Sequence, residues 1–85
     1  MSIEPNNSQT PFATSSIAKF IDAQIENLKD VKTDLEIANE IGYETTIIIS
    51  MFRHGLLPVP LGDVPRLARA LGVDAGHLFR LALEQ

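Results

Sequence analysis

The amino-acid sequence predicts an all-α domain of five helices, and three observations lead to this prediction. Apolar residues recur at three- and four-residue steps along most of the chain after residue 14. Residues that commonly cap helices precede these stretches, and glycines follow three of them. Strand-like character is confined to one window, which would have no second strand to pair with. At 85 residues, the chain has the length of a single domain.

The first 13 residues differ in composition from the rest, and we predict that they form a disordered N-terminal tail. The segment MSIEPNNSQTPFA is rich in Pro, Asn, Ser, Gln and Thr and offers few side chains to a core. It contains no Lys or Arg, so its composition does not favour an arm that follows a DNA groove. The predicted domain therefore spans residues 14–85.

The first predicted helix begins at Thr14 or Ser15, because either residue can cap it. Five apolar residues then fall at helical spacing: Ile17, Phe20, Ile21, Ile25 and Leu28. The polar residues between them carry a net negative charge, and such a face would be repelled by anionic lipid. The apolar stripe is therefore predicted to face the core of the domain.

Residues 33–55 carry two helix-start signals and predict a helix-turn-helix motif. Thr33 and Glu36 have the spacing of a capping box, which places the start of a short helix at Asp34. Gly42 follows this helix and can adopt the left-handed conformation that ends it. A helix of two turns must be held by packing. The residues predicted to provide that packing are Leu35, Ala38 and Ile41.

The second helix of the motif is predicted to span about residues 45–54, with Thr45 or Thr46 as its cap and Gly55 after its end. Its sequence ETTIIISMF contains many β-branched residues, which by themselves favour a strand. A lone strand would have no partner, whereas a helix that crosses Ala38 buries the same isoleucines. We therefore predict a helix at this position.

Two further helices complete the predicted domain. Residues 56–60, LLPVP, predict a stiff connector, and Asp63 is the predicted cap of the next helix because Pro65 is tolerated only near a helix start. The residues of that helix predicted to face the core are Leu67, Ala68 and Leu71. Gly72 ends it, and Asp74 caps the last helix. The apolar residues of the last helix are Leu78, Phe79, Leu81, Ala82 and Leu83.

Three segments of the chain are typical of one family: TDLEIANEIG at 33–42, ISMFRHG at 49–55 and LARALGVD at 67–74. Through them, residues 17–84 resemble the Cro/repressor type (XRE-family) of helix-turn-helix regulator, the lambda-repressor-like DNA-binding domain of bacteria and phages. This resemblance implies a five-helix transcription regulator that binds a double-stranded DNA operator, often as a homodimer. It also implies that the second motif helix enters the major groove.

The register of the second motif helix decides which residues are expected to contact DNA. Counted back from Gly55, Ile49 and Phe52 point inward. The residues then expected to face DNA are Thr45, Thr46, Ile47, Ser50, Met51 and His54. These side chains suit thymine methyl groups and single hydrogen bonds, because none of them can bind guanine or adenine in bidentate fashion. In a register shifted by one residue, Ile47 and Met51 would instead belong to the core.

Contacts to the DNA backbone are expected to be few. Arg53 and His54 are the candidates for phosphate contacts at the end of the helix. Where the family often has a glutamine, this chain has Asp34, whose charge repels phosphate, and where the family often has basic residues it has Leu56 and Leu57. The net charge of −4 also argues against nonspecific coating of nucleic acid. Residues 1–44 carry −5 and residues 45–85 carry +1, so polyanion contacts are expected from the second half.

A protein-interaction module on the same fold is the alternative to a DNA-binding regulator. The apolar side chains of Ile47, Met51, Leu56 and Leu57 could form an exposed patch for another protein. The last helix has more apolar residues than one small core can bury. A homodimer interface is therefore expected there, at Leu78, Phe79, Ala82 and Leu83.

Enzymatic activity is not expected, because no nucleophile lies at a recognisable spacing from a base. The chain has no cysteine, and His54 and His77 do not form a metal-binding pair, so we expect no metal and no cofactor. No apolar run is long enough to span a membrane. The sequence therefore predicts a cytoplasmic protein that does not bind membranes.

Overall fold

The computed structural model describes residues 15–85, and the regular secondary structure of this part of the chain is entirely helical, with no strand. Its elements are α2 (Ser16–Leu28), α3 (Asp34–Glu40), α4 (Ile47–Arg53), the 3₁₀ turn η1 (Leu61–Asp63), α5 (Val64–Leu71) and α6 (Ala75–Glu84). The predicted all-α class and its five helices are confirmed, and the β-branched window is helical. The predicted disordered tail, residues 1–13, lies outside the described residues, as does the alternative cap Thr14.

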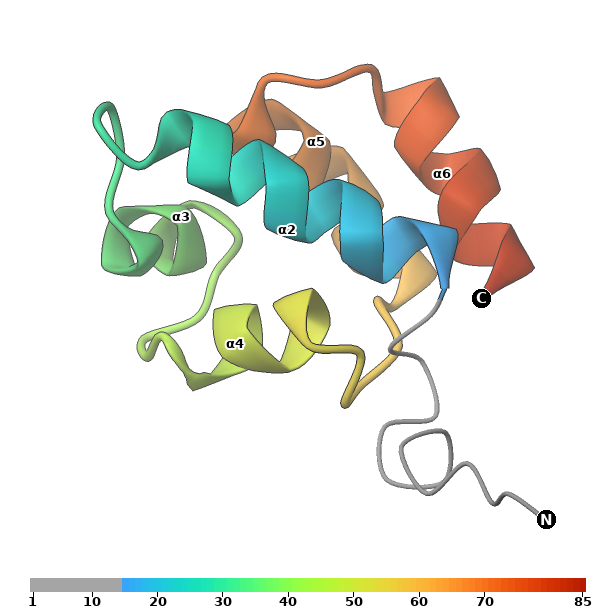
Figure 1. The fold of residues 1–85 in the computed structure, drawn as a ribbon, viewed down its shortest axis with the longest axis horizontal. Helices are drawn as coiled ribbons and strands as arrows, with labels where there is room; N and C mark the ends of the chain where they lie inside the picture. Colours follow the sequence, from blue (N-terminus) through green and yellow to red (C-terminus); the bar gives the residue numbers. More distant parts are fainter. Residues whose placement is uncertain (1–14) are drawn as a thin grey trace, which may run out of the picture.

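Helix α2 packs against three of the other four α-helices. In Figure 1 it crosses the middle of the molecule, with α4 below it, α5 behind it and α6 near its N-terminal end. It contacts all three of these helices, and α3 contacts α4 and α5. Because α4 packs against both α2 and α3, its position depends on these two neighbours.

The core consists of apolar side chains that point inward from every α-helix. On α2, Ile17, Ile21 and Ile25 are buried as their spacing predicts, and Phe20 and Leu28 are partly buried against them. The other large side chains that are fully buried are Ile37, Ile41, Ile49, Phe52, Val64, Leu67, Leu71 and Leu78. Within residues 15–85, no polar or charged residue is buried, so the hydrophobic effect is the main force that holds this interior together.

Three helices begin at predicted capping residues. The Ser15 hydroxyl accepts a hydrogen bond from the Ala18 N–H. Thr33 Oγ1 accepts from the Glu36 N–H at 3.1 Å, and Glu36 Oε1 accepts from the Thr33 N–H at 2.8 Å. The predicted capping box is therefore confirmed. Asp74 caps α6 by accepting from the backbone N–H three residues later.

Helices α3 and α4 end at glycines with left-handed backbone conformations, as predicted. Gly42 has φ 95° and Gly55 has φ 68°. After Gly42, the Tyr43 N–H donates to the Ala38 carbonyl at 2.9 Å, and an equivalent bond of 2.9 Å follows Gly55. Side chains other than glycine rarely adopt this conformation, so both glycines define where these short helices stop.

The inward face of α3 differs from the predicted one at one position. Leu35 was predicted to pack with Ala38 and Ile41, but it is 47% exposed and Ile37 is buried in its place. The buried face is centred near Ile41: at about 100° per residue, Ile37 and Ala38 lie within about 60° of Ile41 around the helix axis, whereas Leu35 lies about 120° away from it. The prediction for Leu35 is therefore wrong, because three-residue steps alone do not define the centre of a helical face.

Asp63 precedes α5 as predicted, but its carboxylate does not cap that helix. Asp63 Oδ2 instead accepts a hydrogen bond of 2.7 Å from the Tyr43 hydroxyl. This hydrogen bond and, to a smaller extent, burial raise the pKa of Tyr43 above its ordinary value. Since Tyr43 lies between α3 and α4, the bond fixes the connection between these helices to the start of α5.

Candidate nucleic-acid interface

Helix α4 has one face in the core and another in solvent. Ile49 and Phe52, which were predicted to point inward, are both 1% exposed. Ile47 is 63% exposed, and Met51 is partly exposed. The shifted register, which would bury Ile47, does not fit these exposures.

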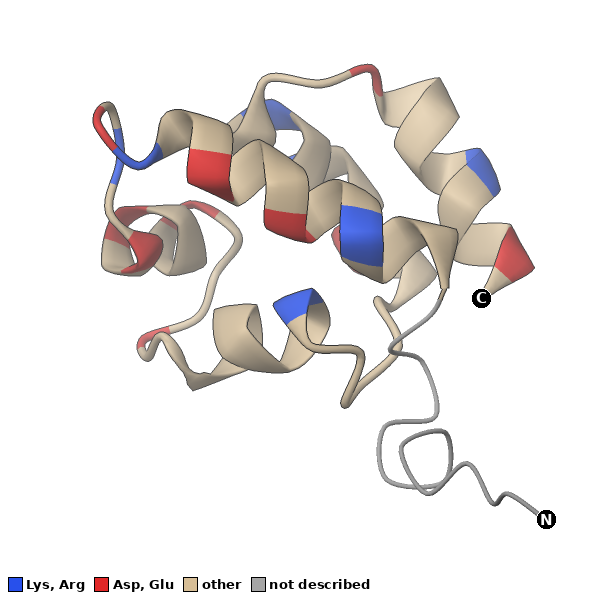
Figure 2. Ribbon diagram, in the orientation of Figure 1, with Lys and Arg blue, Asp and Glu red and all other residues tan. Residues whose placement is uncertain are grey.

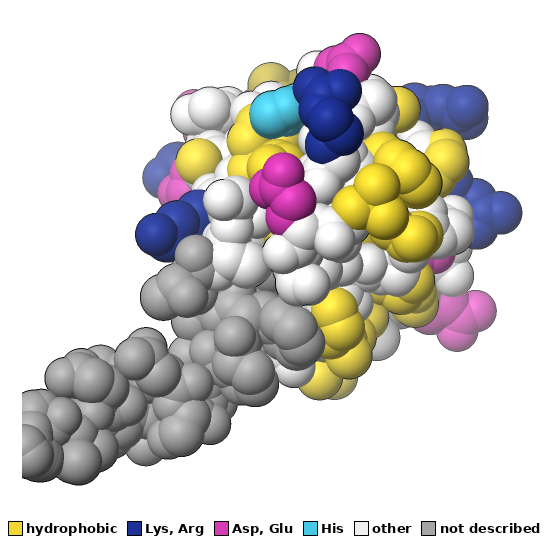
Figure 3. Space-filling view, turned by 90° about the vertical axis from the view of Figure 1, so that its right-hand side faces the viewer, with side chains coloured by type: hydrophobic (Ala, Val, Ile, Leu, Met, Phe, Trp, Pro, Cys, Tyr) yellow, Lys and Arg dark blue, Asp and Glu magenta, His cyan; other side chains and the backbone are white. Residues whose placement is uncertain are grey.

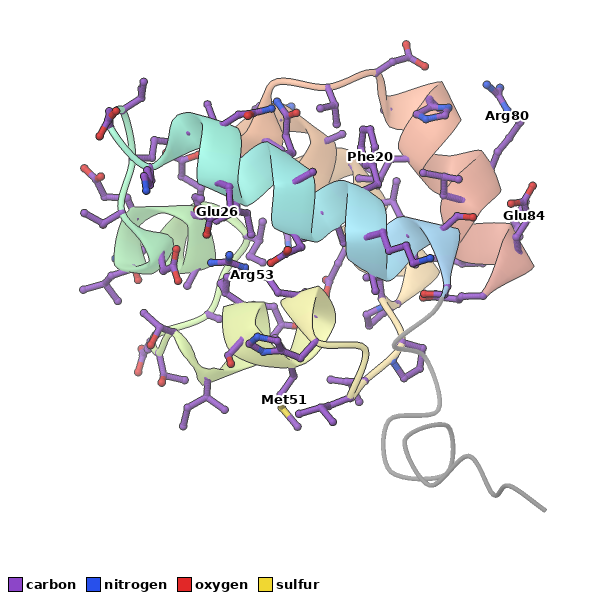
Figure 4. All side chains as sticks on the ribbon, in the orientation of Figure 1. Phe20, Glu26, Met51, Arg53, Arg80 and Glu84 are labelled. Carbon is purple, nitrogen blue, oxygen red and sulfur yellow. The ribbon has the colours of Figure 1, made fainter. Side chains whose placement is uncertain are left out.

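The residues expected at DNA lie together on the solvent side of α4. We define the outer face of α4 as Thr45, Thr46, Ile47, Ser50, Met51 and His54. All six are exposed except Met51, which is partly exposed. Figure 4 shows the Met51 side chain pointing away from α2. The outer face thus comprises the solvent side of α4 and the residues that directly precede and follow this helix, whose opposite side packs in the core.

Local hydrogen bonds order some of the polar groups on this face. Thr45 Oγ1 accepts from the Ile47 N–H at 3.2 Å, while Thr46, which directly precedes α4, makes no capping bond with its side chain. His54 Nδ1 lies 2.9 Å from the Ser50 carbonyl oxygen, to which it donates as an N–H group. Ser50 Oγ lies 3.3 Å from the same Nδ1 and can accept from it, which leaves its own O–H free to donate. The hydroxyls of Thr46 and Ser50 and His54 Nε2 therefore remain as groups that can bind a partner.

The structure places the Arg53 side chain, which is partly buried, between α4 and α2 rather than on the outer face. Its Nε donates to Asp22 Oδ1 at 2.8 Å, and its Nη2 donates to Glu26 Oε2. Its Nη1 lies 3.7 Å from Asp34 Oδ2. In Figure 4 the Arg53 side chain points from α4 towards Glu26 on α2. The residue predicted to contact phosphate therefore already forms ion pairs with three carboxylates of its own chain.

The environment of Arg53 keeps its guanidinium charged. The side chain is only 17% exposed. Burial alone lowers the pKa of Arg53, but the hydrogen bonds to Asp22 and Glu26 and the charge of Asp34 outweigh burial and raise the pKa above its ordinary value. The charge is thus permanent and balanced locally by carboxylates.

Acidic residues dominate the two helices that support α4. Figure 2 shows them along α2 and α3. Three of them, Asp22, Glu26 and Asp34, reach α4 through Arg53. Helix α4 itself, IIISMFR, has Arg53 as its only charged residue. Asp34 was predicted to repel phosphate, and its contact with Arg53 compensates part of its charge. The outer face of α4 is therefore uncharged when His54 is neutral, and it lies next to an acidic surface.

The two leucines after α4 behave differently from each other. Leu56 is exposed, whereas Leu57 is partly buried and packs against the core. The exposed apolar side chains near the outer face are therefore Ile47, Leu56 and, in part, Met51. This surface is smaller than the four-residue patch predicted from the sequence.

The four residues predicted for a dimer interface lie on two different faces of α6. Leu78 and Ala82 are buried in the core of the monomer, so their side chains do not reach a second copy. Phe79 and Leu83 are 41% and 59% exposed. Figure 3 views the α6 side of the molecule and shows hydrophobic side chains gathered there among charged ones. Only Phe79 and Leu83 of the predicted set remain for contact between copies.

Residues 15–85 form no pocket and contain no cluster of side chains suited to a metal ion. None of the helices in this range is both long and apolar enough to traverse a lipid bilayer. No protein-family model, no curated protein and no solved structure matches the chain. Its function is therefore inferred from the geometry of its own surfaces.

Proposed function

We propose that the chain is a sequence-specific DNA-binding transcriptional regulator of the lambda-repressor-like helix-turn-helix type, as in bacteria and phages. In this proposal α3 and α4 form the motif, and α4 enters the major groove of an operator. The main support for this proposal is the exposure of the outer face of α4, while Ile49 and Phe52 on the opposite side of the helix are buried in the core. Such a helix can approach base pairs without losing its own packing.

The chemistry of the outer face favours particular base pairs. Ile47 and Met51 offer apolar contact to thymine methyl groups, and Thr46 and Ser50 offer single hydrogen bonds. The outer face contains no Arg, Lys, Asn or Gln, the residues that read guanine or adenine with two hydrogen bonds. We therefore expect an operator in which the contacted positions are rich in A·T pairs.

A titration with DNA from the genomic neighbourhood of the coding sequence tests the regulator. We expect one fragment to bind with a Kd of about 10⁻⁸ M at moderate salt, at least about 10³-fold more tightly than unrelated DNA of equal length. If a dimer neutralises about two to four phosphates per protomer, the log–log salt slope should lie between about −4 and −7. Equal affinity for both DNAs would contradict the regulator, and a slope near about −10 would contradict the sparse backbone contacts.

We further propose that the DNA-binding form is a homodimer. The exposed pair Phe79 and Leu83 on α6 is the surface assigned to this contact. A two-fold arrangement would allow two α4 helices to lie roughly 34 Å apart, which is one turn of DNA. Each outer face makes few contacts with DNA, and a dimer would double their number.

Sedimentation equilibrium tests the dimer with the variant Leu83→Glu, which places a charge in the proposed apolar contact. At tens of micromolar, on the order of the Kd of a modest interface, the wild type should be dimeric and the variant monomeric. Leu83 is exposed, so the substitution should leave the fold intact, which circular dichroism can verify. A monomeric wild type, or a variant that remains dimeric, would exclude this interface.

The second candidate is a protein-interaction module on the same fold. It is favoured by the exposure of Ile47 and Leu56 and by the position of Arg53, which leaves the outer face of α4 without a cationic Arg or Lys. Such a module would bind both DNAs in the titration only at the nonspecific level. The same titration therefore separates the two candidates.

A further inference from the structure

We propose that Arg53 determines the specificity of DNA binding without contacting DNA, by fixing the orientation of α4 through the Arg53 cluster. This cluster consists of Arg53, Asp22, Glu26 and Asp34. The inference rests on the proposed function and adds a positioning residue to it. It also assigns to Arg53 a role different from the phosphate contact that its place at the end of the helix suggests.

The geometry of the cluster joins three helices at one side chain. Arg53 is the last residue of α4, and it binds Asp22 and Glu26 on α2 through two different nitrogens of its guanidinium. A third nitrogen lies 3.7 Å from Asp34, the first residue of α3. Because the guanidinium is planar and its donors point in fixed directions, these contacts restrict both the position and the rotation of α4.

Helix α4 has little else that is directional to hold it. It is seven residues long, and its buried residues are Ile49 and Phe52. The N-cap residue Thr46 makes no side-chain cap bond, and the bond from the Ile47 N–H to Thr45 Oγ1 is local and does not join α4 to another helix. Apolar packing is not directional, so two buried side chains leave some freedom for a short helix to rotate or slide. The Arg53 cluster supplies the missing directional contact.

Orientation matters more for specificity than for affinity. Base contacts require side chains to meet the edges of particular base pairs, whereas contacts to phosphate are independent of sequence. Arg53 itself is poorly placed for phosphate, because three carboxylates surround it and would repel a fourth anion. Loss of the cluster should therefore lower the ratio of the affinity for specific DNA to the affinity for unrelated DNA.

Two kinds of variant separate positioning from direct contact. Arg53→Gln removes the cation, while the double variant Asp22→Asn/Glu26→Gln keeps the cation and removes its charged partners. The readouts are the affinities for the specific fragment and for unrelated DNA at several salt concentrations. Positioning predicts that both variants lower the ratio of these affinities by about tenfold or more, the effect of misplacing about one base contact. It also predicts an unchanged salt slope in Arg53→Gln.

A direct phosphate contact predicts different results. Arg53→Gln would then weaken binding to both DNAs alike and reduce the salt slope by about one per protomer. The double variant would release Arg53 and strengthen binding without changing the ratio. Either result would overturn the proposal. Lys29→Gln is the matched control, since Lys29 is an exposed cation that lies 3.9 Å from Glu26 and is itself not a member of the Arg53 cluster.

Amide hydrogen exchange provides a readout that needs no DNA. In Arg53→Gln, amide exchange should accelerate in α4 and remain slow in α5 and α6, because α4 loses its directional contact and α5 and α6 do not. Arg53→Lys should show the same change to a smaller extent. If the wild type lacks specific DNA binding, the proposed function fails, but this exchange result still decides whether Arg53 positions α4. Unchanged exchange in α4 of both variants would overturn the positioning role.

Discussion

Replacement of Phe52 by alanine is expected to lower the free energy of unfolding by about 3–5 kcal/mol, the cost of removing a large buried aromatic side chain. Phe52 is among the largest fully buried side chains, and it holds α4 against the core. Domains of this size are stable by about 5–15 kcal/mol. The loss is therefore a large part of the total, and urea denaturation followed by circular dichroism will measure it.

The control for this experiment lies on the same helix. Ile47→Ala removes an apolar side chain that is mostly in solvent, so its effect on stability should be within about 0.5 kcal/mol. The contrast between the two variants tests the register of α4 directly. Similar losses from both substitutions would show that α4 is rotated relative to the structure described above.

The second large effect concerns DNA. Ile47→Glu should weaken binding to the specific fragment by about 10- to 100-fold, because it removes an apolar base contact and introduces a negative charge into the groove. Ile47 is exposed, so the unfolding midpoint should remain close to that of the wild type. Fluorescence anisotropy with labelled fragment provides the measurement.

Val31→Glu is the matched control for this variant. Val31 is also an exposed apolar residue, but it lies between α2 and α3 rather than on α4. The same change in charge there should weaken binding far less, since only long-range repulsion remains and salt screens it. If both variants lose affinity equally, the effect is one of net charge, and the outer face of α4 does not contact DNA.

Features set by neighbouring residues could be predicted from the sequence. The capping box of Thr33 and Glu36 and the helix-ending glycines depend on residues only a few positions apart, and the structure confirms them. The inward direction of Ile49 and Phe52 was also predicted, because it follows from counting along one helix from Gly55. The all-α class results from such local signals acting together.

Features set by distant residues were not predictable in this way. Arg53 and Asp22 are 31 residues apart, and nothing in their local sequence indicates that they meet. The crossing of α2 and α4 brings them together, and this crossing is decided by the whole core. For the same reason, the spacing of apolar residues in α6 did not show that Leu78 and Ala82 are buried while Phe79 and Leu83 are exposed.

The most direct test of the proposal that α4 presents its outer face to DNA, while Arg53 stays bound to its carboxylate partners, is a ¹H–¹⁵N NMR titration with the specific fragment. The account predicts the largest shift changes at Thr46, Ile47 and Ser50, with the Arg53 Nε–H signal retained near its position because Asp22 still binds it. Largest changes on α2 or α5 with an unaffected α4, or a large shift of the Arg53 Nε–H signal, would contradict the claim.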